Sequence, residues 1–285
     1  MNQQSVNTPE PVVLTIAGFD PSAGAGIVAD LKTFAAHGCY GVAAVTAITV
    51  QNTRGVDDVH PVEAHVLKEC LRALFADTSV KAVKVGMVAT RANAVAIHEA
   101  LEANASLPSV LDPLVRSTSG YDLIDRAGLE FVRDHLLRQA TVITPNLHEA
   151  GALTGMNVQS VEEMKTAAQK LLELGAHAVV VTGGHLERPV DVFADGSDLQ
   201  TFAGDRVKPE NIHGAGCTFS SAIAAHLGHG RQLAEAIVLA KAYVTEAIKK
   251  AYPVGSGRVP LNHFYRTQEA SRIATYAPAV PGPVH

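Results

Sequence analysis

Short apolar runs alternate with longer amphipathic segments along most of the chain, and this alternation restricts its fold more than any other feature. Runs typical of strands buried on both faces occupy residues 11–17, 42–50, 80–85, 109–111, 141–144 and 177–181. The segments between them carry apolar residues at helical spacing, as in Ile27, Leu31 and Phe34. The alternation predicts an α/β fold with a doubly wound, mostly parallel sheet and helices on both faces. Asp195-Gly196 predicts an additional small β-hairpin.

Composition and the two chain ends limit the kind of protein further. Residues 1–10 are polar and are expected to be a flexible N-terminus, residues 11–266 to form a single domain, and residues 267–285 to be a disordered Pro/Gly-rich tail. The net charge of -5 argues against a nucleic-acid partner, and no apolar run is long enough to span a membrane. Three widely spaced cysteines without a C-x-x-C pair predict a reduced, cytoplasmic protein without a structural zinc site.

Each predicted strand ends in glycines or polar side chains. The first is followed by the turn at residues 18–26, and the others by Gln51-Asn52-Thr53, Gly86-Met87, Asp112-Pro113, Asn146 to Glu149 and Thr182-Gly183-Gly184. Open α/β sheets bind their ligands at the carboxyl ends of the strands. These segments are therefore expected to share one edge of the sheet and to form one site.

Residues 211–220 (NIHGAGCTFS) precede an apolar helical pattern and are typical of a phosphate-binding helix start. Gly214, Ala215 and Gly216 put little bulk at the turn, so an anion could reach the unpaired N–H groups of the helix N-terminus. At the same terminus the pKa of Cys217 is expected to fall from about 8.5 to between about 3.5 and 7.5, so that a thiolate could accept a proton. The alternative is a glycine-rich turn followed by a buried helix with a core cysteine.

Several candidate residues have a structural explanation as well as a functional one. Asp30 could be a solvated helix residue or a ligand contact. Asn146 and Glu149 lie three residues apart at a helix start, where they could hold hydrated Mg²⁺ beside ATP or simply cap the helix. Asp112 could contact magnesium or begin an ordinary turn. Met87 could contact a ligand or fill the core, and Cys70 is expected in the core because it lies in a helical apolar pattern.

The motifs together resemble those of the ribokinase-like kinases, and within them the hydroxymethylpyrimidine and phosphomethylpyrimidine kinases of thiamin biosynthesis. The matching segments are AGFDPSAGAGIVADLKTFAAHG, TAITVQNTRGV, KVGM, VLDP with TSG, ITPNLHEA, GGHL, NIHGAGCT and VPLNHF. They span nearly the whole chain in the family's order. The resemblance implies ATP-dependent phosphorylation of 4-amino-5-hydroxymethyl-2-methylpyrimidine and then of its monophosphate, with ATP and Mg²⁺ as cofactors, and commonly a homodimer.

The resemblance also implies roles for individual residues. Cys217 matches the family's presumed general base, and Gly214, Ala215 and Gly216 match its anion hole. The resemblance also places Gly18, Asp30, Gln51 and Met87 around the pyrimidine, and Asn146 and Glu149 in the Mg²⁺ and phosphate motif. From their positions at the same sheet edge, Leu114 is further assigned to the substrate, Thr182, Gly184 and Arg116 to the nucleotide or its phosphates, and Asp112 to the metal.

Some positions depart from the family pattern. Thr182 stands where many members carry a phosphate-contacting lysine, a loss that could cost about 1.5 to 3 kcal/mol. Arg116, where relatives tend to be apolar, could restore that charge. Ala215 replaces a threonine of the anion hole, and Phe19 adds apolar bulk beside the predicted pyrimidine site. Two alternatives therefore stay open: a pyridoxal-type kinase of vitamin B6 salvage, and a catalytically weakened ligand-binding paralogue.

Overall fold

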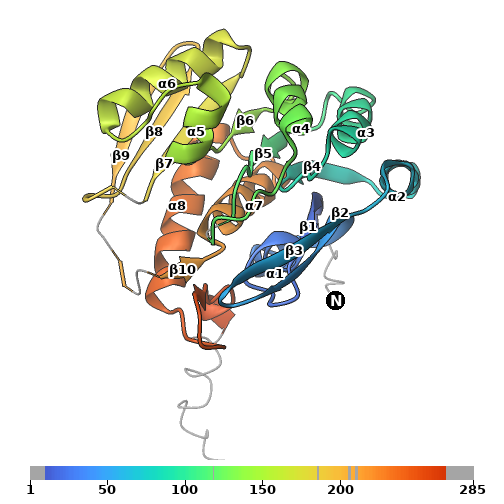
Figure 1. The fold of residues 1–285 in the computed structure, drawn as a ribbon, viewed down its shortest axis with the longest axis horizontal. Coiled ribbons are helices and arrows are strands. Elements are labelled where there is room, and N and C mark those ends of the chain that lie inside the picture. The colour runs from blue at the N-terminus through green and yellow to red at the C-terminus, as the bar shows by residue number, and fades with distance from the viewer. Residues whose placement is uncertain (1–9, 118, 185, 205–206, 209–210, 268–285) are drawn as a thin grey trace, which may run out of the picture.

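The computed structural model describes residues 10–117, 119–184, 186–204, 207–208 and 211–267 (Figure 1). The expected flexible N-terminus and disordered tail fall almost entirely on residues 1–9 and 268–285, which lie outside this range. Within it the chain forms a three-layer α/β structure.

A nine-stranded sheet forms the middle layer, with the strand order β3-β2-β1-β4-β5-β6-β7-β8-β9. Its strands are β1 (Val12–Phe19), β2 (Tyr40–Asn52), β3 (Gly55–Pro61), β4 (Val80–Val85), β5 (Ser109–Leu111), β6 (Val142–Ile143), β7 (Ala178–Gly183), β8 (Val190–Asp195) and β9 (Leu199–Ala203). The six strands from β2 to β7 run parallel, while β3 and β8 are antiparallel to their inner neighbours. This confirms the predicted fold class, and the antiparallel pair β8 and β9 is the predicted hairpin.

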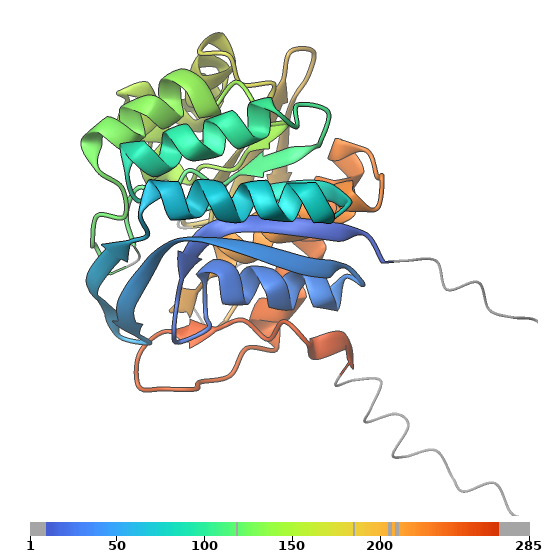
Figure 2. The same cartoon turned by 90° about the vertical axis from the view of Figure 1, so that its right-hand side faces the viewer.

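Helices cover both faces of the sheet (Figures 1 and 2). One face carries α2 (Ala64–Asp77), α3 (Arg91–Glu102), α4 (Arg126–Phe131), the π-helical turn η1 (Val132–Leu136), α5 (Leu147–Thr154) and α6 (Val161–Glu173). The other carries α1 (Gly26–Ala36), α7 (Ala215–Gly228) and α8 (Leu233–Lys249). Two short strands, β10 (Ile212–His213) and β11 (Val259–Pro260), pair in parallel in front of α7.

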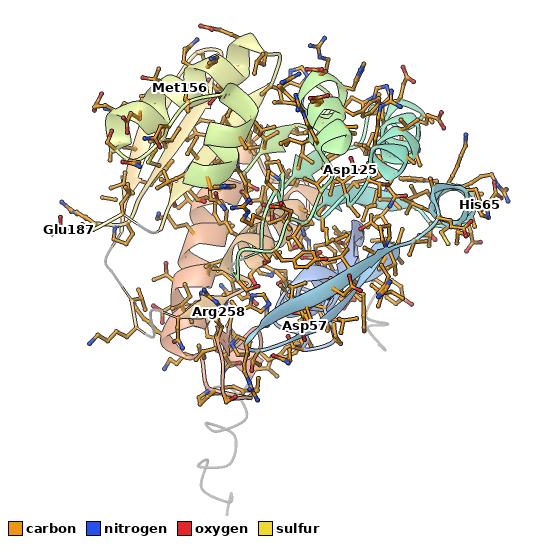
Figure 3. The ribbon with its side chains drawn as sticks, in the orientation of Figure 1. Asp57, His65, Asp125, Met156, Glu187 and Arg258 are labelled. Carbon is orange, nitrogen blue, oxygen red and sulfur yellow. The ribbon has the colours of Figure 1, made fainter. Side chains whose placement is uncertain are left out.

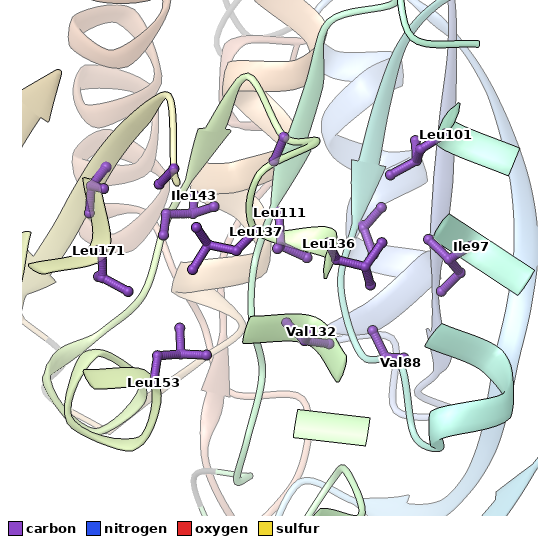
Figure 4. Close-up of a cluster of buried hydrophobic side chains, with 14 of the residues drawn as sticks. Val88, Ile97, Leu101, Leu111, Val132, Leu136, Leu137, Ile143, Leu153 and Leu171 are labelled. Atoms are coloured by element: carbon purple, nitrogen blue, oxygen red, sulfur yellow. The ribbon is translucent and has the colours of Figure 1, made fainter. Parts of the chain in front are cut away.

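A separate apolar cluster lies on each side of the sheet. The larger one joins the sheet to α2 through α6, and Figure 4 shows its centre around Ile97, Leu111 and Leu136. The second packs α1, α7 and α8 against the opposite face. Most strands between the two clusters are apolar on both faces. The β-branched runs in the sequence therefore predicted these strands correctly.

Two details differ from the sequence-based expectations. Strand β3 was not predicted, because GVDDVHP lacks an apolar alternation and none of its residues is buried. Cys70 was predicted in the core but is exposed. The buried residues of α2 are only Leu67 and Leu71, so its buried stripe is narrower than the apolar pattern predicted and does not include Cys70.

Candidate active site

A cavity of about 420 Å³ lies at the carboxyl ends of the parallel strands. The turns after β1, β2, β4, β5, β6 and β7 line it together with the N-terminus of α7. The predicted site residues in its wall are Gly18, Gln51, Met87, Asp112, Leu114, Arg116, Asn146, Glu149, Thr182, Gly184, Gly214, Ala215, Gly216 and Cys217. Asp30 does not line the cavity. The fold thus brings nearly all candidates together, while their roles stay predictions.

The start of α7 is the predicted anion hole, and we call Gly214 to Cys217 the anion cradle. Gly214 precedes the helix with φ 87°, a conformation that favours glycine. A Cβ atom there would also lie 1.9 Å from the carbonyl oxygen of Gly24. The first helical N–H groups have no acceptor within the helix, so they are available to an anion in the cavity.

The turn after β1 is held against the cradle by Asp20 and His213, two residues that the sequence did not single out. The carboxylate of Asp20 accepts hydrogen bonds from the backbone N–H groups of Gly24 at 3.1 Å and Ala25 at 2.9 Å. Its Oδ2 lies 3.2 Å from His213 Nε2, which is also 3.3 Å from Gln51 Nε2. Burial raises the pKa of Asp20, but the hydrogen bonds, first among them that of His213, hold it below its ordinary value.

Asp112 and Glu149 form the acidic side of the cavity. Glu149 belongs to a capping box: Asn146 Oδ1 accepts from the Glu149 N–H at 3.0 Å, and Glu149 Oε2 accepts from the Asn146 N–H at 2.9 Å. The capping explanation is therefore confirmed. Burial, and then the charge of Asp112, raises the pKa of Glu149 to about 8, while burial raises that of Asp112 to about 6.

A cation would fit these two carboxylates. Glu149 Oε1 is buried and has no hydrogen-bond partner among the residues that the structure describes. The same residues contain no group of three or more His, Cys, Asp or Glu arranged to hold a metal by themselves. A magnesium ion here would thus take further oxygen ligands from water and nucleotide phosphates, as Mg²⁺ commonly does.

Asp30 lies behind the cavity wall in a buried ion pair with Lys84 of β4. Lys84 Nζ is 2.9 Å from Asp30 Oδ2 and 3.1 Å from Oδ1, and both side chains are fully buried. Thr15 donates to the same carboxylate at 2.6 Å and Ser221 of α7 at 2.7 Å. The solvated alternative for Asp30 is wrong. Lys84 was missed, although a second lysine within the strand pattern VKAVKV was a visible signal.

Cys217 is buried beside this network, and its predicted low pKa is wrong. Burial is the largest influence on the thiol and raises its pKa to about 12. Lys84 favours the thiolate, while the carboxylates of Asp112 and Asp30 oppose it. Ser220 of the same helix donates to Asp112 Oδ2 at 3.2 Å, which ties α7 to the acidic side of the cavity.

The predicted nucleotide contacts Asn146, Thr182 and Gly184 all line the cavity. Asn146 and Thr182 form a parallel β-bridge, which places the ends of β6 and β7 side by side. Lys241 of α8, another residue that the sequence reasoning missed, also lines the cavity and forms an ion pair with Asp191, the register partner of Thr182. Arg116 lies in the loop after β5, where its Nε donates to Asp122 Oδ1 at 2.8 Å.

Comparisons with known proteins agree with this geometry. A family model described as phosphomethylpyrimidine kinase matches residues 20–262. The hydroxymethylpyrimidine/phosphomethylpyrimidine kinase of Rhizobium meliloti is 45% identical over 260 residues, covering 90% of this chain and 97% of that protein. A thiamine biosynthesis bifunctional protein of Geobacter sulfurreducens is 42% identical over 92% of this chain, which spans only 54% of that longer protein.

Solved structures give the same fold and two kinds of kinase. The ADP complex of pyridoxal kinase from Bacillus subtilis has a TM-score of 0.83 and 35% identity, covering 91% of this chain and 99% of that one. The phosphomethylpyrimidine kinase of Clostridium difficile has a TM-score of 0.75 and 39% identity, covering 84% of this chain and 100% of the other.

Proposed function

The chain belongs to the phosphomethylpyrimidine kinase family, and we propose that it transfers the γ-phosphoryl group of ATP to 4-amino-5-hydroxymethyl-2-methylpyrimidine and then to the resulting monophosphate. The observation that carries this proposal is the single cavity that combines an anion cradle, a buried carboxylate pair and a polar strand end at Gln51. Each part matches one requirement of phosphoryl transfer between two small molecules.

The cradle would stabilise the transferring phosphoryl group. The N–H groups at the start of α7 and the helix dipole favour the negative charge that spreads over the phosphoryl oxygens. Asp112 and Glu149 would hold Mg²⁺, which supplies charge neutralisation of the phosphates when bound. Asn146, Thr182 and Gly184 would contact the nucleotide, and Arg116 would add positive charge to a phosphate in the cavity.

Cys217 remains the proposed proton acceptor, and it could act only as the thiolate, the form that Lys84 favours and that burial and the nearby carboxylates oppose. Phosphoryl transfer requires little covalent assistance from the protein, so positioning and charge stabilisation would provide most of the acceleration. The proton of the acceptor hydroxyl is then needed only late in the transfer. The transfer therefore makes little demand on Cys217 as a base.

Gly18, Gln51, Met87 and Leu114 would form the acceptor half of the site. Met87 Sδ would lie 2.7 Å from a Cβ on Gly18, so these two residues pack directly together and glycine keeps the space open. The Gln51 amide can exchange hydrogen bonds with the edge of a heteroaromatic ring. Asp30 does not line the cavity, so it would act from behind this wall by holding Lys84.

The second candidate function is a pyridoxal kinase, because solved structures of that activity are among the similar chains. Pyridoxal also carries a hydroxymethyl group on a heteroaromatic ring. Phe19 is 37% exposed and lines the cavity, where its side chain narrows the acceptor half. This narrowing does not by itself distinguish a pyrimidine acceptor from the pyridine ring of pyridoxal. A third candidate is a ligand-binding protein with little turnover. It is based on Thr182 and Ala215, which replace a phosphate-contacting lysine and a threonine of the family's anion hole.

A homodimer in the cytoplasm completes the proposal. Ile48 and Val50 are 52% and 47% exposed and, two residues apart on β2, lie on the same face of the sheet. Exposed apolar residues on a sheet face are typical of protein interfaces. Among the described residues, no helix has the length and hydropathy required to cross a membrane.

ADP release with MgATP tests the proposed function directly. The acceptors are the hydroxymethylpyrimidine, its monophosphate and pyridoxal, with a reaction lacking acceptor as the control. Turnover of both pyrimidines with slow pyridoxal turnover is expected. Turnover of pyridoxal alone would contradict the proposal and identify the activity as that of a pyridoxal kinase. Tight binding of an acceptor without ADP release would favour a ligand-binding protein.

A further inference from the structure

Two residues of the cavity wall have no assigned role in the proposed transfer. Asp20 follows β1 and His213 belongs to β10, directly before the anion cradle, and both line the cavity. His213 Nε2 lies 3.2 Å from Asp20 Oδ2 and also contacts the side-chain amide of Gln51, the proposed acceptor contact. The imidazole thus connects the turn after β1 to the acceptor half of the site.

Packing holds the imidazole ring of His213 in place. A Cβ atom on Gly24 would lie 2.6 Å from His213 Cδ2, so the ring packs directly against the backbone of the turn after β1. The backbone of His213 pairs with Pro260 of β11. The side chains of His213 and Asp20 are only 18% and 4% exposed, so water competes little for the contact between them.

The carboxylate of Asp20 determines that His213 Nε2 carries a proton. Ser22 donates its N–H and its hydroxyl to Asp20 Oδ1, each at 2.7 Å, and the N–H groups of Gly24 and Ala25 donate to Oδ2. Burial raises the pKa of Asp20, but its hydrogen bonds hold the pKa below the ordinary value, so the carboxylate is ionised at neutral pH. An ionised carboxylate can only accept, and the nitrogen that faces it therefore donates.

The proton on His213 Nε2 in turn fixes the amide of Gln51. The same N–H faces one end of this amide, and it can donate only to an oxygen there. The other end lies 3.1 Å from the Thr49 hydroxyl, which is also 2.9 Å from the Phe19 carbonyl oxygen. Thr49 has one proton, and the shorter contact to Phe19 takes it, so Thr49 accepts from the amide.

Both ends of the Gln51 amide therefore require the same order of its atoms. The nitrogen and oxygen of an amide have nearly the same shape, so the hydrogen bonds around them decide which is which. Here they require oxygen toward His213 and nitrogen toward Thr49, the reverse of the order that places Nε2 3.3 Å from His213. With this order each of the contacts joins one donor to one acceptor.

We propose that His213 and Asp20 are positioning residues that fix the orientation of the Gln51 amide, so that the site selects acceptors by the order of donor and acceptor groups along the ring edge. This inference rests on the proposed function, because Gln51 contacts the acceptor only within it. The fixed amide keeps one oxygen lone pair and one N–H for the ring. An aminopyrimidine complements these two groups with an amino group beside an unprotonated ring nitrogen. Because its hydroxymethyl group must reach the cradle, the ring cannot turn over to suit a reversed amide.

Initial rates with two acceptors at saturating MgATP test these positioning residues. The first acceptor is the hydroxymethylpyrimidine, and the second is its oxo analogue, in which a carbonyl replaces the amino group and the adjacent ring nitrogen carries a proton. His213→Leu removes the donor, whereas His213→Gln restores an N–H near the position of Nε2. His213→Leu is expected to lower the preference in kcat/KM for the amino acceptor by about tenfold, and His213→Gln by less than about threefold.

Two comparisons separate positioning of Gln51 from general damage to the site. His65→Leu is the matched control, since His65 is an exposed residue of α2 at the outer edge of the molecule (Figure 3), and it should leave the preference unchanged. KM for ATP should stay within about twofold in every variant. Equal losses with both acceptors in His213→Leu, or a similar rise in KM for ATP, would overturn the proposal and assign His213 to support of the cradle. Thermal unfolding verifies that each variant is folded.

Nitrogen NMR of the wild type with isotope-labelled histidine tests the hydrogen-bond order without turnover. The His213 signals, assigned by their loss in His213→Gln, should show a proton on Nε2, and an unprotonated Nε2 would refute the inference. If the wild type phosphorylates neither pyrimidine, the proposed function fails, and the spectrum still decides the hydrogen-bond order. Calorimetric titration of both acceptors into wild type and His213→Leu then measures the preference directly, and the same preference in the two proteins would also refute the inference.

Discussion

Replacement of Lys84 by methionine is the most informative single change for the core of this fold. The variant keeps most of the side-chain volume but leaves Asp30 buried without its cation. Burial by itself would lower the pKa of Lys84, but the carboxylate of Asp30 raises it above its ordinary value, so Lys84 is charged at neutral pH. Removal of one partner of such a pair is expected to cost about 3 to 5 kcal/mol of unfolding free energy.

The double variant Lys84→Met with Asp30→Leu should be more stable than either single variant. It removes both charges together, and apolar replacement of a buried pair is often neutral or stabilising. The hydroxyl groups of Thr15 and Ser221, which donate to Asp30 at 2.6 and 2.7 Å, lose their acceptor at a cost of about 1 kcal/mol each. The single changes should therefore sum to about 6 to 10 kcal/mol and the double change to about 2, a coupling of about 4 kcal/mol or more.

Urea unfolding followed by circular dichroism measures all four proteins of this cycle. Arg126→Met with Glu130→Leu, an exposed ion pair within α4, is the matched control and should show a coupling below about 1 kcal/mol. A coupling below about 1 kcal/mol for Lys84 and Asp30 would refute the reasoning, since the two charges would then not depend on each other.

Four further changes test the cradle, its support and the proposed interface. Cys217→Ser should keep the fold and lower kcat by about 10²-fold or more, and a kcat near wild type would rule out a role in proton transfer. Gly214→Ala should abolish activity and lower the melting temperature, because its Cβ would lie 1.9 Å from the Gly24 oxygen; an unchanged melting temperature would contradict this. Burial lowers the pKa of His263 from 6.5 to about 4, so between these pH values the unfolded chain binds more protons than the folded one. The unfolding free energy should therefore fall as pH drops from 6.5 to 4, and His263→Gln should weaken this fall in urea titrations at several pH values. The same pH dependence in the variant and the wild type would exclude His263 as its cause. Ile48→Lys should convert the proposed dimer to a monomer in analytical ultracentrifugation, whereas an unchanged mass would exclude this face.

The sequence was sufficient for the general fold and for the location of the candidate site. The runs at residues 11–17 and 80–85 are apolar and β-branched because both faces of those strands are covered by helices. Glycines at positions 214 and 216 indicated a tight approach to a helix start, and Gly214 indeed has a positive φ. These features are local, so their physical causes can be read from neighbouring residues.

Tertiary structure alone decided the charge states and partners within the site. Cys217 lies in the first turn of a helix, as the sequence indicated, but burial together with the carboxylates of Asp112, just after β5, and Asp30 of α1 raises its pKa. Asp30 pairs with Lys84 across 54 positions of sequence, and no local pattern indicates that the two are buried together. Strand β3 likewise exists because β2 pairs with it, without an apolar pattern of its own. Desolvation and long-range pairing depend on which distant groups surround a residue, and the folded chain alone determines those groups.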